Sequence, residues 1–269
     1  MGAVYECLLG GTPRLLMAAG QDLEPYWEVY RQHFRGHIVE WMEKHRIGNL
    51  SQEDRLQVEK NRIQFGDVYV TDPIRDPNLL GCQEKPWCGE PRIDLLTEDF
   101  ITPNELFYVR NHLNVPDIDP DEYVLVVKGK GIKKHKFSLH DLKTKFKKHE
   151  VVTTLQCAGN RREDLHDDTR KIFIAPHWVI GAISTAKWGG VKMRDVLKHC
   201  GLDVDGIALG KVESGNIKHI KFEGYDTDET GFCYGGSAPI DKAIDPLGEA
   251  IFAYEMNDEP LPRDHGKIF

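Results

Sequence analysis

Apolar side chains recur every three or four positions in the first fifty residues, a spacing that predicts an amphipathic helix. The residues that set this period are Trp27, Tyr30, Phe34, Ile38, Trp41 and Met42. Asp22 stands where a helix cap is wanted, and Gly48 with Asn49 is expected to end the helix. The polar stretch 51–66 that follows predicts either a short helix or a linker.

The pattern changes after this helix. Between 67 and 103 prolines and glycines are frequent, which predicts an extended loop. Beyond it, strands are expected at 123–127, 151–156, 219–222 and 250–256, and helices after Ser138 and over 191–200, the second closed by Gly201. Strands and helices do not alternate regularly and no GxGxxG loop is present, so the sequence predicts an α+β fold with a mixed sheet. The domain boundary is expected within 52–68.

The charge balance narrows the classes of function. The 269 residues carry a formal net charge of −8, which argues against a nucleic-acid or anionic-membrane surface. No apolar stretch reaches the roughly 18 residues that a membrane-spanning helix needs, and the start of the chain lacks the basic residues of a signal peptide. We therefore expect no nucleic-acid partner, no membrane span and no targeting segment.

The cysteines are too few for a disulfide scaffold and form no CxxC pair or zinc-type spacing. They are Cys7, Cys82, Cys88, Cys157, Cys200 and Cys233. The sequence predicts reduced, mostly buried thiols, with a disulfide between Cys82 and Cys88 as the alternative.

The stretch Val152–Arg162 (VTTLQCAGNRR) places Cys157 directly after a β-rich run. The two residues that follow are small enough to let a bulky cofactor approach the sulfur. The two arginines that end the stretch would stabilise a thiolate, the form that ligates metals, and would offer forked donors to an oxyanion. The alternative is a buried cysteine at a strand end beside a solvated arginine pair.

Other polar clusters point the same way, although each also fits a plain strand end, turn or helix surface. A strand through Arg110, Asn111 and His112 would put the first and third on one face, which suits a phosphate or oxyanion. In LPRDHG, an Asp next to a His can fix the tautomer of the imidazole. In FEGYD, a carboxylate follows a strand, which alone is uninformative.

His33 and His37 lie four residues apart on one face of the predicted N-terminal helix. This spacing suits a metal, and one of the two could be an axial haem ligand. Taken together, the candidates comprise one thiolate and several Arg and His donors, without paired carboxylates or a Ser–His arrangement. That set favours redox chemistry over hydrolysis.

Several motifs in a fixed order resemble the molybdenum domain of the sulfite oxidase family. They are FITPNELFYVRNHLNVP, HEVVTTLQCAGNRR, GAISTAKWGGVKMRDVL, FEGYD and AYEMNDEPLPRDHG. The preceding stretch from Gly10 to Leu50 resembles the second half of the family's cytochrome b5-like haem domain. The resemblance implies a partial, mainly helical b5-like segment over 1–52, a linker over 53–66 and a C-terminally incomplete molybdopterin-binding domain over 67–269.

The resemblance also implies roles for individual residues. Cys157 would be the protein ligand to molybdenum in a Mo-molybdopterin cofactor, and His33 would match one ligand of the haem iron. The residues that would hold the pterin are Tyr108, Val109, Arg110, Asn111, His112, Asp226 and His265. The residues that would shape the anion pocket are Arg110, Arg162 and Trp178.

By the same resemblance, the reaction would be the two-electron oxidation of sulfite to sulfate, with electrons passed through haem to cytochrome c. The family members with a haem domain are homodimers of the mitochondrial intermembrane space. A haem-domain remnant that precedes the molybdenum domain favours sulfite oxidase over nitrate reductase, in which that module follows. A nitrate reductase-like molybdoenzyme and a non-catalytic truncated isoform are the alternatives.

Two departures from the family alter these expectations. Leu8-Leu9-Gly10-Gly11 stands where the family has an HPGG motif, so the first axial histidine is absent and haem b is not expected to be retained. The chain stops at Phe269, where the family continues with the rest of the molybdenum domain and a dimerisation domain. Family membership and activity of this chain are therefore separate expectations.

Overall fold

The computed structural model describes residues 16, 19–24, 27, 36–61, 69–164, 176–208, 217–227, 233–248 and 250–266. The chain divides into two compact units. The smaller comprises Met1–Val70 with Glu229–Gly231, and the larger comprises Thr71–Asp228 with Phe232–Phe269. Among the helices described, none has the length and apolar character needed to cross a membrane.

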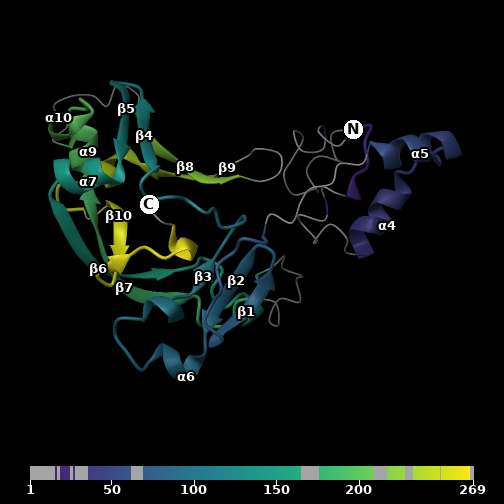
Figure 1. Cartoon of the computed structure of the whole chain (residues 1–269), viewed down its shortest axis with the longest axis horizontal. Helices are drawn as coiled ribbons and strands as arrows, with labels where there is room; N and C mark the ends of the chain where they lie inside the picture. The colour runs from purple at the N-terminus through teal and green to yellow at the C-terminus, as the bar shows by residue number, and fades with distance from the viewer. Residues whose placement is uncertain are drawn as a thin grey trace. The chain divides into compact units, whose positions relative to one another are not determined.

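Two helices are described in the smaller unit, α4 (Gly36–Lys44) and α5 (Gln52–Lys60) (Figure 1). The N-terminal helix was predicted to run to Gly48, but α4 ends at Lys44. The Ser51 side chain caps α5 by accepting a hydrogen bond from the backbone N–H of Asp54, which confirms the short-helix alternative for this polar stretch. His33 lies outside the described residues, and so does the side chain of His37.

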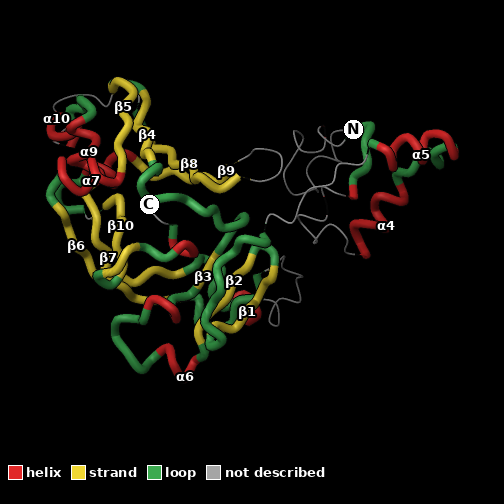
Figure 2. Tube along the Cα trace, in the orientation of Figure 1, coloured by secondary structure: helices red, strands yellow, loops and turns green. Residues whose placement is uncertain are grey.

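The described part of the larger unit contains four small sheets together with several short helices (Figures 1 and 2). One sheet has the order β1-β2-β3, from Leu79–Glu84, Trp87–Pro91 and Val109–Arg110. Another has the order β11-β10-β7-β6, from Glu259–Pro260, Ile251–Met256, Ile183–Lys192 and Lys148–Gln156. The other two are hairpins, formed by β4 (Val124–Gly129) with β5 (Ile132–Ser138) and by β8 (His219–Thr227) with β9 (Cys233–Pro239).

The α+β prediction is confirmed, but its mixed sheet is wrong for the strands described. Every strand pair in the described part of the chain is antiparallel. Short connections favour this arrangement, because antiparallel neighbours can be joined by a tight turn whereas parallel neighbours need a crossover.

The extended loop predicted for 67–103 is wrong in its middle, where β1 and β2 pair and the short helix α6 (Ile93–Leu96) follows. The prolines do not prevent this hairpin, because Pro86 lies between the two strands and Pro91 ends the second. Pairing of β2 with β3 then places this sheet next to the Arg110 motif.

Several strand and helix predictions are confirmed with shifted ends. Ser138 caps α7 (Leu139–Lys145) through a capping box with Asp141. The predicted helix over 191–200 begins only at Met193, because the residues before it belong to β7. Gly201 follows this helix, α9 (Met193–His199), at a φ of 96°, the left-handed conformation that glycine adopts at low cost.

β7, the strand that lies between β6 and β10, was not predicted from the sequence. Its sequence, ISTAKWGGVK, lacks a clear alternation, because both faces of its second half are buried. Gly190 is needed there: a Cβ at this position would lie 2.1 Å from the carbonyl oxygen of Phe252. Close approach of β7 and β10 therefore depends on a residue that strand propensities disfavour.

The largest core cluster lies between the β4–β5 hairpin and four short helices. These helices are α7, α9, α10 (Val204–Ala208) and α11 (Ile240–Ile244). Phe137, Leu142, Val196 and Ile244 are among its fully buried side chains. A second cluster, around Phe107, Trp188 and Met256, lies on the four-stranded sheet.

Asn257 ties the β10–β11 turn to two other segments. Its side-chain amide donates to the Thr102 carbonyl at 2.9 Å and to Asn104 at 2.8 Å, and its side-chain oxygen accepts from the Lys187 N–H at 2.9 Å. Its φ is 52°, in the left-handed region that Asn tolerates better than most residues. One side chain therefore fixes the turn and satisfies two backbone groups.

We predict that Asn257→Gly lowers the free energy of unfolding by roughly 2 kcal/mol, because glycine keeps the turn but leaves those groups without partners. Asp258→Gly is the matched control in the same turn. Asp258 has a φ of 66°, and its ion pair with Lys187 is solvent-exposed on the carboxylate side. Its replacement should change the free energy by less than about 1 kcal/mol in urea unfolding. Equal losses in the two variants would contradict the role of the Asn257 side chain.

Candidate functional site

Backbone hydrogen bonds continue the β6–β7 pairing past the last paired residues, Gln156 and Ile183. The Cys157 N–H donates to the Ala182 carbonyl at 3.0 Å, and the Ala182 N–H donates to the side-chain oxygen of Asn160 at 3.1 Å. The strand end that carries the cysteine is therefore fastened to the segment that precedes β7.

A tight turn follows the cysteine. The Asn160 N–H donates to the Cys157 carbonyl at 2.9 Å, and the Gly159 N–H lies 3.4 Å from the Cys157 sulfur. Arg161 then adopts a φ of 63°, which costs a non-glycine residue about 1–2 kcal/mol. The turn holds the half-exposed Cys157 thiol at the end of β6, so the alternative of a sealed, buried cysteine is wrong.

The two arginines after this turn point in different directions. The Arg161 side chain is 67% exposed and pairs with Asp164 at 2.6 Å. Arg162 turns inward: its guanidinium donates to the Pro176 carbonyl at 3.1 Å. A Cβ on Gly159 would lie 2.4 Å from that guanidinium, so the small residue predicted to admit a cofactor also makes room for Arg162.

Trp178 lies at the centre of the cluster beside the cysteine. It is fully buried with Cys88 and Ala182, and Tyr108 and Cys157 pack against this group. Its ring meets that of Tyr108 edge to face, at 6.2 Å between centroids. The indole N–H is buried and has no hydrogen-bond partner among the described residues. A buried donor without a partner is costly, and such groups are common where a ligand binds.

Glu90, which the sequence analysis did not single out, anchors the segment after Trp178. The carboxylate is 4% exposed and accepts from the N–H groups of Val179 at 2.9 Å and Gly181 at 2.7 Å. No local sequence signal marks Glu90, because the N–H groups that it accepts from lie 89 and 91 positions away.

Arg110 and Cys88 face each other across β2 and β3. The Arg110 guanidinium lies 3.6 Å from the Cys88 sulfur and donates to the Asn111 carbonyl. Burial raises the pKa of Cys88, as it raises that of Cys82 to about 12. Both are free thiols, which confirms the reduced state and makes the alternative disulfide wrong.

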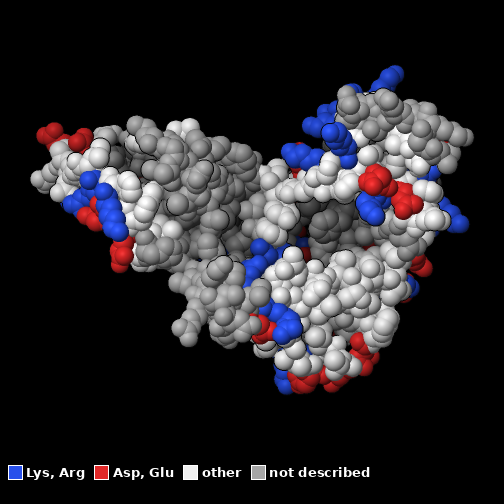
Figure 3. All heavy atoms as spheres, turned by 180° about the vertical axis from the view of Figure 1, so that it is seen from behind, with Lys and Arg blue, Asp and Glu red and all other residues white. Residues whose placement is uncertain are grey.

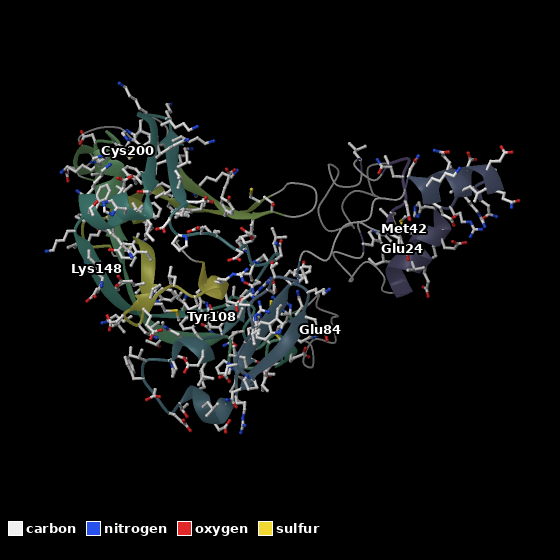
Figure 4. All side chains as sticks on the ribbon, viewed as in Figure 1. Glu24, Met42, Glu84, Tyr108, Lys148 and Cys200 are labelled. Carbon is white, nitrogen blue, oxygen red and sulfur yellow. The ribbon has the colours of Figure 1, made fainter. Side chains whose placement is uncertain are left out.

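Burial of the cysteines is less complete than predicted. Cys88 and Cys200 are buried, Cys82 and Cys157 are intermediate, and Cys233 is exposed. Cys200 lies among the helices at one end of the larger unit, away from Tyr108 beside the three-stranded sheet (Figure 4). Of the described cysteines, Cys82, Cys88 and Cys157 belong to the Trp178 cluster.

The RNH and RDHG motifs meet through Asp264. This carboxylate accepts from the Asn111 side chain at 2.8 Å and from two nitrogens of Arg75, at 2.8 and 2.9 Å. Arg75 also bonds to Asp72 and lies over the ring of Trp87. Arg75 is a site residue that the sequence analysis missed, and nothing in the loop-like pattern around it marks its partner, which is 189 positions away.

Among the described residues, the Asp264 carboxylate accepts hydrogen bonds from Arg75 and Asn111, and not from the neighbouring His265 as the motif suggested. His265 contacts the ring of Phe107 edge to face, with 5.0 Å between centroids. Burial lowers the pKa of His265 to about 4, so the imidazole is neutral at physiological pH.

His112 and Asp226 lie toward the β8–β9 hairpin. The strand predicted through 110–112 stops at Arg110, so strand alternation does not place His112 on the Arg110 face. His112 instead stacks on Tyr234 of β9, with 3.9 Å between ring centroids. Desolvation and the charge of Arg110 lower the pKa of His112 to about 4. Burial raises the pKa of Asp226, which lies within β8, not after it.

Seen from behind, the larger unit has a hollow in its surface, with Lys or Arg side chains at its edge (Figure 3). Within the described residues, no group of three or more His, Cys, Asp or Glu side chains is arranged to hold a metal ion. The Cys157 thiol, the nearby arginines and the Trp178 N–H together suit a bound group that needs one thiolate and several cationic or N–H donors.

Comparison with known proteins identifies the family. Residues 112–267 match the family described as "Oxidoreductase molybdopterin binding domain". The mitochondrial sulfite oxidase of Rattus norvegicus is 45% identical over 96% of this chain. The chain belongs to the sulfite oxidase-type molybdopterin oxidoreductase family. The resemblance seen in the motifs is thus confirmed.

Other members of the sulfite oxidase family set the extent of the match. The sulfite oxidase of Gallus gallus is 43% identical over 95% of this chain. The chain spans 44% of the length of the rat protein and 53% of the chicken protein. The sulfane dehydrogenase SoxCD from Paracoccus pantotrophus shares the fold, with a TM-score of 0.53 at 20% identity over 82% of this chain and 47% of that chain.

We predict that Arg75→Ala destabilises this family member by roughly 3 kcal/mol, because it leaves the Asp264 carboxylate partly buried without its cation. Arg75 and Asp264 side chains are only 11% and 9% exposed. Arg92→Ala is the control, since the Arg92–Asp94 pair is exposed and worth about 1 kcal/mol or less. Urea unfolding of both variants measures the difference, and similar midpoints would count against the buried pair.

Proposed function

We propose that this chain binds a molybdenum–pterin cofactor through Cys157 and acts in the two-electron oxidation of sulfite to sulfate. The observation that carries the proposal is the Trp178 cluster: a half-exposed thiol beside a buried indole N–H that lacks a partner. Membership of the sulfite oxidase-type family supports the same reaction.

The residues around the thiol fit such a group. A thiolate suits a soft or high-valent metal. The cluster leaves the indole N–H of Trp178 available to an acceptor, and Arg162 lies across Gly159 from Cys157. Sulfite is a small oxyanion, present near neutral pH as a mixture of monoanion and dianion, and charge-assisted N–H donors are the groups that hold such an anion best.

The pterin would be held by the segment Tyr108–His112 together with Asp226 and His265. Asn111 and His265 are brought close by the Asp264 link, and His112 contacts the β9 strand that pairs with the strand of Asp226. The neutral imidazoles of His112 and His265 can donate and accept hydrogen bonds without adding charge. This matches the mixed donor and acceptor edges of a pterin ring.

In the proposed reaction the side chains position and screen. Arg110 and Arg162 would hold the sulfite oxygens, and Trp178 would donate its N–H to the anion. Burial raises the pKa of Tyr108 to about 12, so its phenol stays protonated and adds no negative charge against the substrate. When bound, the molybdenum–pterin group supplies the redox step, which no side chain here can perform.

The route of electrons and the cell compartment are also part of the proposal. We infer that electrons leave toward a haem domain and cytochrome c as in the family, and that the native setting is the mitochondrial intermembrane space. The chain itself is not expected to hold haem b, because Leu8-Leu9-Gly10-Gly11 replaces the family's first histidine motif and leaves His33 as a single ligand. A homodimer is expected only with the family's dimerisation domain.

We predict that the chain, expressed in a host that makes the cofactor, carries molybdenum and pterin together, and that Cys157→Ser loses the metal. Metal analysis and pterin fluorescence measure the two independently of activity. Cys200→Ser is the control, because that thiol lies in the other core cluster. Absence of both molybdenum and pterin from the unaltered chain would favour a non-catalytic role.

We predict that Arg110→Ala and Arg162→Ala each raise the KM for sulfite roughly tenfold or more, since a hydrogen bond to a charged group is worth about 1.5–3 kcal/mol. Arg161→Ala is the matched control: it removes the same charge one residue away, from a side chain that pairs with Asp164. Steady-state assays with ferricyanide as acceptor bypass the haem. An unchanged KM in both test variants would reject the anion pocket. Faster turnover of nitrate, assayed separately with a reduced viologen as electron donor, would favour the nitrate reductase-like alternative.

A further inference from the structure

The β4–β5 hairpin carries a concentration of positive charge that the net charge of the chain conceals. Between Val124 and Ser138 there are five lysines and no acidic residue, whereas the whole chain has a net charge of −8. The lysines of this hairpin, called here the hairpin lysines, are Lys128, Lys130, Lys133, Lys134 and Lys136. All five are exposed.

Strand register places several of these lysines together. The inner face of the hairpin, with Leu125, Val127 and Phe137, packs on the main core. The outer face alternates with it, and Val126 lies opposite Lys136 across the two strands. Val126 is 43% exposed, so an apolar and a cationic side chain lie side by side on this outer face.

The hairpin lysines are also poorly neutralised. No ion pair in the described part of the chain involves Lys130, Lys133, Lys134 or Lys136. The charge of Lys128 lies near that of Glu223. Like charges held close on a two-stranded ribbon repel one another, so the free hairpin is less stable than it would be beside an anionic surface.

The lysines just beyond the hairpin provide the contrast. Lys145 pairs with Asp141 at 2.9 Å, and Lys148 pairs with Glu255 at 2.5 Å. Lys143 lies over the ring of Tyr254 at 5.2 Å. Lysines in the neighbouring elements therefore have partners within the fold, whereas the hairpin lysines face outward.

We propose that the β4–β5 hairpin docks on an anionic lipid bilayer, through the hairpin lysines and the exposed valines between them. Lys and Arg side chains project from the part of the unit that holds β4 and β5 (Figures 1 and 3). A cluster of this size is what anionic headgroups attract, and each lysine near such a surface contributes on its own.

Three features favour lipid over other anionic partners. All the cations are lysines, whose point charges suit many mobile headgroups, whereas paired recognition of one carboxylate or phosphate favours arginine. Phe137 is the one Phe, Tyr or Trp side chain within β4 and β5, and it is buried, so these strands expose none of those three rings to stack on a base. The exposed valines add apolar contact that an interfacial region accepts.

The acidic remainder of the chain does not prevent this contact. Charges farther than about 8 Å from a surface are largely screened at physiological salt, so only the hairpin and its neighbours act on the membrane. The expectation drawn from net charge, that no anionic membrane surface exists, applies to the average of the molecule and not to this face.

The test is co-sedimentation of the full chain with vesicles of phosphatidylcholine alone or mixed with phosphatidylserine. Binding should require phosphatidylserine and fall as salt is raised. The triple variant Lys133→Gln, Lys134→Gln, Lys136→Gln should lower the partition coefficient roughly a hundredfold. Each lysine near an anionic surface contributes about 1 kcal/mol, and about 1.4 kcal/mol corresponds to a tenfold change in the coefficient.

The control variant Lys145→Gln, Lys148→Gln, Lys221→Gln removes the same charge from lysines already in ion pairs. It should lose much less binding, and circular dichroism checks that both variants fold. Equal losses in the two variants, or equal binding to both vesicle types, would overturn the proposal. Tighter binding to poly-glutamate or RNA than to the mixed vesicles would also overturn it, in favour of another anionic partner.

Discussion

The candidate site depends on the hydrogen bonds that carry the β6–β7 pairing beyond the ends of both strands. Cys157 and Ala182 continue the ladder, and Asn160 closes it with its side chain. A strand end would otherwise be free to fray. Because it is fastened here, a thiol and a buried indole are held in one cluster even though they come from segments twenty-one positions apart. The strained φ of Arg161 is tolerated because bonds on both sides fix the turn.

Burial decides which of the charged groups act in the site. Arg161 and Arg162 are adjacent and chemically identical, yet one lies in solvent with Asp164 and the other reaches the carbonyl of Pro176 beneath the turn. Asp264 likewise serves Asn111 and Arg75 and not the histidine beside it. In water, Arg161 and Arg162 would be nearly equivalent, and so would the possible partners of Asp264. The low dielectric of a partly buried site separates them.

The same reasoning explains why net charge is a poor guide to surfaces. A formal charge of −8 coexists with a hairpin that is purely cationic, since screening makes the potential at a surface a local property. Ion pairs neutralise Lys145 of α7 and Lys148 of β6, which have carboxylates within reach, whereas β4 and β5 contain no carboxylate of their own.

The sequence by itself determined the local elements and the family. Residues a few positions apart determine the Ser138 capping box, the strand that ends at Gln156 and the end of the helix before Gly201. The ordered motifs around Cys157 and Asp264 are specific enough to indicate the family from the sequence. It did not reveal β7, whose glycines are explained only by the backbone of β10, nor the β1–β2 hairpin among prolines. It could not find Glu90 or Arg75, because the partners of these side chains lie 89 and 189 positions away. Tertiary structure alone decided which arginine turns inward, since long-range packing determines which side chains leave water.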